Sequence, residues 1–176
     1  NFGSQKKLSR ASFLATNFNR EYLLNFFDSF FKKDNDLKKM NFSLEIGPNT
    51  DVESVPPVND VYITMLPGGD YKETAQKANE LVKKGFNPVP HFPARSINDE
   101  KELKDYISRC KDGGAKQALI IGGGREPVGK FDSSFQLLET GYFEKMKIGI
   151  AGHPEGSPDI SDSNLEKAMI DKKPYA

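Results

Sequence analysis

Short apolar stretches alternate along most of the chain with longer segments of helical pattern. The apolar stretches lie at 41–47, 60–66, 86–92, 116–121 and 147–152. The segments between them carry apolar residues three or four positions apart, at 72–84, from Ser96 or Asn98 through Cys110, at 135–141 and at 164–173. The first pattern is typical of buried strands and the second of amphipathic helices. Regular alternation of the two predicts an α/β protein with a parallel sheet.

Each predicted strand runs into a polar or glycine-rich tip. The carboxyl ends of parallel strands share one edge, where catalytic groups gather. We therefore expect one site that collects a carboxylate, a hydroxyl, two imidazoles and an exposed backbone loop. The tips are Glu45, Thr64, His91, Gly122–Gly124 and His153.

Two architectures fit this alternation: a doubly wound open sheet and a (β/α)8 TIM barrel. The glycines after 116–121 are not followed promptly by a helix, so the dinucleotide fingerprint is not met. Polar tips after every strand favour the barrel. A complete barrel typically needs ~250 residues, whereas this sequence has 176. The expectation is a partial barrel, covering about the first five βα units at 41–176, within a longer polypeptide.

The segment 1–40 is predicted to be an N-terminal helical extension. Apolar residues recur at helical spacing over 20–33, including four phenylalanines, whereas 1–20 is weakly patterned. Such a stripe indicates either a helix that faces the core or an oligomer interface.

Composition excludes some classes of function. The 25 basic and 25 acidic residues balance, so no net field favours nucleic acid or an anionic membrane. The lone Cys110 excludes an internal disulfide and fits a reducing compartment. No apolar run is long enough to span a bilayer, and no signal-peptide pattern is present. We expect a cytoplasmic protein that binds small molecules, and a homo-oligomer is compatible with this.

Three features carry candidate chemistry. Glu45 lies among apolar residues, where burial would raise its pKa toward the range of a general acid; a structural salt bridge is the alternative. His91 lies between prolines that fix its backbone, and it is either a ligand contact or a satisfied core histidine. Gly122–Gly124 allow close approach of a flat or anionic ligand, and Arg125 is placed to reach a phosphate. No metal-ligand spacing accompanies the two histidines.

The chain resembles the methylenetetrahydrofolate reductase family over 41–176. The matching pieces occur in the family's order at about its spacing. They are Ser43-Leu-Glu-Ile-Gly-Pro48, Val61-Tyr-Ile-Thr64, Val89-Pro-His91, Leu119-Ile-Ile-Gly-Gly123 and Ala151-Gly-His-Pro-Glu155. The resemblance implies a TIM barrel that binds FAD. It also implies transfer of a hydride from NAD(P)H through the flavin to 5,10-methylenetetrahydrofolate, giving 5-methyltetrahydrofolate in one-carbon and methionine metabolism.

The resemblance also implies residue roles. Glu45 matches the acid that helps to open the folate ring, and it is expected to contact the folate together with Gly124. The flavin contacts are expected at Thr64, His91, Gly122, Gly123, Gly124, Ala151 and His153. His153 stands where the family often has a tyrosine. Gly122 and Gly124 stand where it often has an arginine and an aspartate. Asp162, Asn164 and Lys167 are weaker candidates on the last helix.

Two other functions stay open at this point. One is a flavin-free folate-dependent reductase or methyl-transfer barrel. The other is a non-catalytic partner subunit that binds folate or flavin and docks through the phenylalanine stripe.

Overall fold

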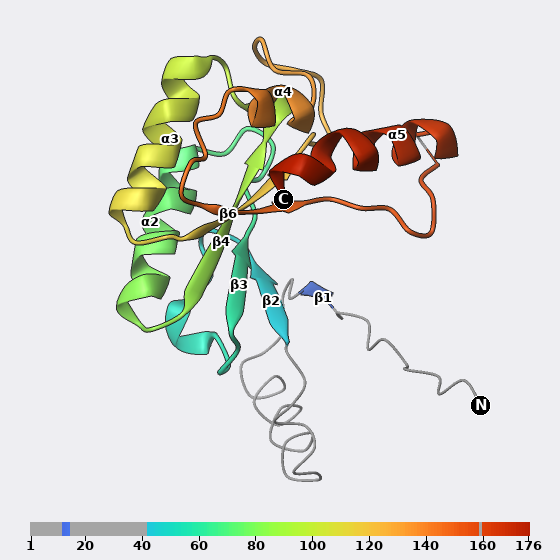
Figure 1. The fold of residues 1–176 in the computed structure, drawn as a ribbon. Helices are drawn as coiled ribbons and strands as arrows, with labels where there is room; N and C mark the ends of the chain where they lie inside the picture. Colours follow the sequence, from blue (N-terminus) through green and yellow to red (C-terminus); the bar gives the residue numbers. More distant parts are fainter. Residues whose placement is uncertain (1–11, 15–41, 159) are drawn as a thin grey trace, which may run out of the picture.

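The computed structural model describes residues 12–14, 42–158 and 160–176 and shows an α/β fold with a parallel sheet (Figure 1). The described strands are β1 (Ser12–Leu14), β2 (Ser43–Ile46), β3 (Asp60–Ile63), β4 (Asn87–Pro93), β5 (Gln117–Ile121) and β6 (Lys147–Ile150). The described α-helices are α2 (Tyr71–Lys83), α3 (Glu100–Asp112), α4 (Ser134–Glu139) and α5 (Asp162–Lys172). Short 3₁₀ turns are η2 (Val52–Ser54), η3 (Ala94–Ser96) and η4 (Lys173–Tyr175).

The strands pair in sequential order from β1 to β6, and every printed pairing is parallel. A doubly wound sheet reverses its strand order at a switch point, and the described strands show no such reversal. The five predicted strands are all present. β1 was not predicted, and it lies within the segment assigned to the N-terminal extension. The helix predicted at 20–33 lies outside the described residues.

One face of the sheet packs against helices. On β2 and β3, Leu44, Ile46, Val61 and Ile63 are buried, whereas the alternate positions are half-buried. Figure 1 shows α2 and α3 side by side along one side of the sheet. They bury residues three and four positions apart, which are Ala75, Ala78 and Leu81 on α2 and Leu103, Tyr106, Ile107 and Cys110 on α3. Among the described residues, the second face of β2 and β3 is only half-buried, and it is the face where a site can form.

Local signals fix the helix ends. Asp70 caps α2 by accepting a hydrogen bond from the backbone N–H of Lys72. Asp99 caps α3 in the same way through the N–H of Glu102, so neither Ser96 nor Asn98 is the cap. None of the described helices is long and apolar enough to cross a membrane.

Candidate functional site

Four polar or aromatic side chains lie on the half-buried face of β2, β3 and β4. Glu45 on β2 pairs in register with Tyr62 on β3, which pairs with Val89 on β4. Thr64 and His91 lie two positions beyond Tyr62 and Val89, and alternation along a strand returns them to this same face. The sheet therefore brings together three predicted site residues, Glu45, Thr64 and His91, and adds Tyr62, which was not predicted.

Glu45 and His91 face each other across β3. The distance from Oε2 of Glu45 to Nε2 of His91 is 3.9 Å, which is beyond hydrogen-bonding reach. Among the described residues, Nε2 of His91 is the one buried side-chain polar atom without a hydrogen-bond partner. An unsatisfied polar atom in a buried position is costly, and its presence here points to a ligand that would satisfy it.

Burial shifts the ionisation of both members of this pair. It raises the pKa of the Glu45 carboxyl above its usual value, because desolvation penalises the carboxylate. The same effect lowers the pKa of His91 to about 4, so the imidazole is neutral at physiological pH. A neutral imidazole offers either a donor or an acceptor at Nε2, depending on the tautomer.

The backbone holds His91 rigidly. Its carbonyl accepts a hydrogen bond of 2.8 Å from the hydroxyl of Tyr106 on α3. Its strand carries Pro88, Pro90 and Pro93, which restrict the backbone on both sides. The residue as a whole is 6 % exposed. His91 is therefore fixed in position with its free nitrogen turned toward the Glu45 side of the face.

Thr64 joins the ends of β2 and β3. Its backbone N–H and its hydroxyl both donate to the carbonyl of Ile46, at 2.9 and 3.2 Å. The hydroxyl oxygen keeps acceptor capacity for a ligand donor.

The three glycines after β5 differ in their surroundings. A Cβ added at Gly122 or Gly124 would meet nothing within 4 Å, so the backbone there is open to a ligand. Gly123 has a φ of 95° and packs close to Pro93, so it is required by the turn itself. Arg125 lies near Gly68, since a Cβ there would be 3.9 Å from its Nη1. The loops after β3 and β5 thus approach each other at the carboxyl edge.

A cavity of about 190 Å³ lies at the carboxyl ends of β5 and β6. Its lining includes three predicted residues, Gly122, Ala151 and His153, together with side chains from α5 and η3. The full lining is Arg95, Gly122, Asp132, Ser133, Ser134, Ala151, Gly152, His153, Ile160, Leu165, Ala168, Met169 and Lys172. Asp162, Asn164 and Lys167 are not among these residues, because the cavity lies against another face of α5.

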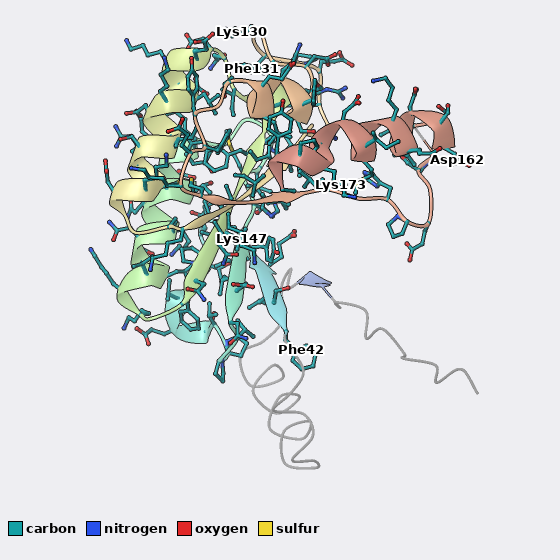
Figure 2. The ribbon with its side chains drawn as sticks, viewed as in Figure 1. Phe42, Lys130, Phe131, Lys147, Asp162 and Lys173 are labelled. Atoms are coloured by element: carbon teal, nitrogen blue, oxygen red, sulfur yellow. The ribbon has the colours of Figure 1, made fainter. Side chains whose placement is uncertain are left out.

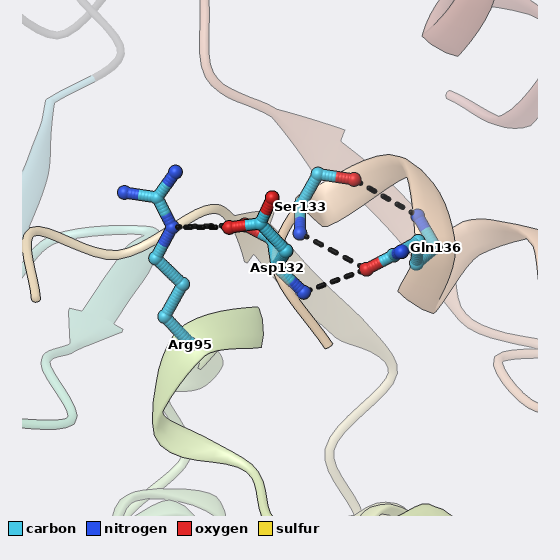
Figure 3. Close-up of polar contacts among 4 residues, drawn as sticks. All are labelled: Arg95, Asp132, Ser133 and Gln136. Atoms are coloured by element: carbon cyan, nitrogen blue, oxygen red, sulfur yellow. Dashed lines mark hydrogen bonds and ion pairs between the residues drawn. The ribbon is translucent and has the colours of Figure 1, made fainter. Parts of the chain in front are cut away.

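Arg95 and Lys172 bring two basic side chains to the lining of this cavity, and Asp132 brings one carboxylate. Nε of Arg95 donates to the carbonyl and the carboxylate of Asp132, at 2.9 and 3.2 Å. Figure 3 shows the two Nη atoms turned away from Asp132. Burial lowers the pKa of Lys172. The pattern of strand tips missed both residues, since Arg95 follows its tip by four positions and Lys172 comes from a helix.

The loop that carries Asp132 is fastened to the start of α3. Lys130 pairs with Glu100, and the N–H of Lys130 donates to the carbonyl of Asn98. Figure 2 places Lys130 and Phe131 at this edge of the molecule. Ser133 then opens α4 with a capping box, in which Gln136 accepts from the Ser133 N–H (Figure 3). The contacts place Asp132 firmly against Arg95.

Six of the eight predicted site residues thus form two groups, and Gly123 and Gly124 belong to neither. Glu45, Thr64 and His91 lie on the sheet face and do not line the cavity, whereas Gly122, Ala151 and His153 do. His91 pairs in register with Leu119 on β5, and Leu119 pairs with Gly149 on β6. Gly122 and Ala151 lie two or three positions further along those strands. The cavity is therefore on the carboxyl side of the Glu45–His91 pair.

No protein-family model matches the chain.

Proposed function

We propose that this protein reduces 5,10-methylenetetrahydrofolate to 5-methyltetrahydrofolate with NAD(P)H through bound FAD. The observation that carries the proposal is the Glu45–His91 pair on the open sheet face. A carboxyl with a raised pKa lies 3.9 Å from a buried imidazole nitrogen that has no partner. The resemblance of the surrounding sequence pieces to the methylenetetrahydrofolate reductase family supplies the reaction.

The strand order supports the barrel architecture that this family implies. Parallel strands in sequential order, with α2 and α3 together over one face, are what an arc of a (β/α)8 barrel presents. In a closed barrel the half-buried face would be the interior, and Glu45, Thr64 and His91 would point into it near the carboxyl end. Active sites of such barrels lie at that end.

The residues present fit a flavin. Nε2 of His91 offers a buried partner for a ring heteroatom, and the hydroxyl of Thr64 is an acceptor. The open backbone at Gly122 and Gly124 allows close approach of a flat ring. The bound flavin would supply hydride transfer. Arg95 and Lys172 would contact the phosphates from the cavity lining.

Arg95 and Lys172 are also relevant to Gly122, which departs from the family pattern. Gly122 stands where the family often has an arginine, but Arg95 lines the same cavity and donates its N–H to the carbonyl of Gly122, at 2.9 Å. Positive charge is therefore present at the cavity despite the glycine. Gly124 stands where the family often has an aspartate, and Asp132 is the aspartate that lines this cavity, with its carboxylate held by Arg95.

Glu45 would act as the general acid. Its raised pKa keeps a larger protonated fraction near neutral pH than an ordinary glutamate would have. From β2 it would deliver that proton to a nitrogen of the folate ring as the ring opens. His91 stays neutral because burial opposes its charging, so it does not draw the proton from Glu45 as an imidazolium.

The test is a visible absorbance spectrum of the purified protein after incubation with FAD, followed by assays of NAD(P)H oxidation. We expect bound flavin, NAD(P)H oxidation with menadione as acceptor, and turnover with methylenetetrahydrofolate. A protein that never takes up FAD but turns over folate would favour the flavin-free alternative. Flavin binding with neither reaction would favour a binding subunit.

A further inference from the structure

We infer that Tyr62 is a positioning residue whose ring shields the Glu45–His91 pair from water on the amino side of the site. The inference rests on the proposed function because that function makes Glu45 the acid. Its main test, however, measures only the pKa of His91 and does not require turnover. Neither the strand tips nor the family resemblance pointed to this residue.

The sheet register places Tyr62 between the two partners. β3 lies between β2 and β4, so the side chains of Glu45 and His91 meet above β3. On this face β3 presents Tyr62 and then, two residues later, Thr64. Tyr62 is the register partner of Glu45, and its ring meets the ring of His91 edge-on, with centroids 6.0 Å apart at 70°. Thr64 lies on the carboxyl side, where a ligand would enter.

Tyr62 is thus the common neighbour of both groups. Side chains of register partners on one face of adjacent strands lie side by side, so the side chain of Tyr62 stands next to that of Glu45, and its ring contacts His91 edge-on. The exposed fractions of the two side chains are 25 % for Glu45 and 7 % for His91. Because each group is kept from water, the charged form of each is disfavoured.

The other charged side chains of the described strands do not explain the pKa shifts of Glu45 and His91. On β3, Asp60 shares the face but accepts a hydrogen bond of 2.8 Å from Gln117 on β5, at the amino end. On β6, Lys147 is the register partner of Gln117 and is exposed. β2, β4 and β5 bring no further ionisable side chain besides Glu45 and His91. Among the residues that the structure describes, desolvation is the cause of both pKa shifts, with no charged neighbour contributing to either.

Removing the ring should therefore change the ionisation of the pair. With water admitted, the pKa of Glu45 falls and that of His91 rises toward its ordinary value near 6.5. At 3.9 Å, the two then favour a carboxylate–imidazolium pair. A carboxylate has no proton to donate, so the acid would be lost without any change to Glu45 itself.

The experiment is an NMR titration of the histidine Cε1–H signals. The chain has two histidines, and His153→Gln assigns them. In the wild type we expect His91 to titrate at about pH 4. Tyr62→Thr, which keeps a strand-forming residue but removes the ring, should raise that midpoint by at least about one pH unit. Tyr62→Phe keeps the ring and should leave the titration midpoint of His91 unchanged.

The inference is overturned if Tyr62→Thr leaves the midpoint of His91 unmoved, or if Tyr62→Phe moves it as far as Tyr62→Thr does. Circular dichroism checks that Tyr62→Thr folds; if it does not, Tyr62→Leu takes its place. For Tyr62→Leu we expect a smaller rise in the titration midpoint of His91. An unchanged midpoint would then contradict the inference. In turnover assays, Tyr62→Thr should lose folate reduction at neutral pH more than NAD(P)H–flavin reduction. A wild type without either activity would remove the proposed function, whereas the titration would still decide the role of Tyr62.

Discussion

At the scale of single residues, burial alone sets the ionisation of the candidate site. It acts in opposite directions on the two partners, raising the pKa of Glu45 and lowering that of His91. Burial therefore disfavours the charged form of each group. The amino-acid pattern predicted Glu45 and His91, because a carboxylate in an apolar run and a histidine between prolines stand out. It could not predict Tyr62, since an aromatic residue in a strand is ordinary core material and its role depends on register.

Glu45→Gln removes the proposed acid while keeping its shape. General acid catalysis contributes about 10²–10⁴-fold, so we expect folate reduction to fall by about that factor. The NAD(P)H–flavin half-reaction should stay close to the wild-type rate, because no proton from Glu45 enters it. Stopped-flow measurement of the two half-reactions checks this. Glu73→Gln, an exposed change on α2, is the control, and equal loss in both half-reactions would contradict the assignment.

His91 should make the protein acid-sensitive. Its pKa is about 4 in the folded state and near 6.5 when unfolded. The unfolded state thus binds more protons between these values, and stability falls as pH drops from about 6.5 to 4. The shift corresponds to about 3 kcal/mol. Urea unfolding across this range should show a shallower pH dependence in His91→Gln than in the wild type; parallel curves would show that His91 is not the cause.

At the scale of elements, the sequence predicted what local patterns control. The strands and helices predicted over 41–176 are all present within a few residues, because period and caps are local. The cap of α3 was misassigned, since Asn98 and Asp99 are adjacent and both suit the position. The position of Arg95 at the cavity could not be predicted from the sequence, because it depends on long-range packing between the loop after β5 and the start of α3.

Gly129 is the tightest point of that fit. A Cβ there would lie 2.0 Å from the carbonyl oxygen of Asn98 and 2.5 Å from its Cα. Because the obstacle is backbone, Gly129→Ala should push the loop away and weaken the Arg95–Asp132 contact. Overpacking of this kind costs roughly 1–3 kcal/mol. Urea unfolding measures the loss.

The matched control for Gly129→Ala is Gly124→Ala, on the same loop. Its Cβ would enter open space, so we expect a change in stability near zero. If the two variants unfold alike, the close approach at Asn98 does not hold the loop in place.

At the scale of the whole molecule, the candidate site lies between a well-packed part and a peripheral one. The sheet with α2 and α3 contains most of the described core. α5 has no buried residue, packs beside α4 and supplies one wall of the cavity (Figure 1). Elements with few buried contacts open at low free energy. The pattern of strand ends predicted the cavity residues that follow β5 and β6. The residues that α5 contributes could not be predicted, because they depend on how the chain turns back after β6.

FAD should therefore stabilise α5 more than the rest of the molecule. Without ligand, we expect amide hydrogen exchange to be fast in α5 and slow in β4 and α3, which are buried. With saturating FAD, contacts to Lys172 and Met169 in the cavity should slow exchange across 162–172. The amides of α2, which supplies no residue to the cavity lining, serve as the internal control. Since ligand binding also stabilises the fold globally, protection that rises equally in α2 and α5 would place the flavin elsewhere.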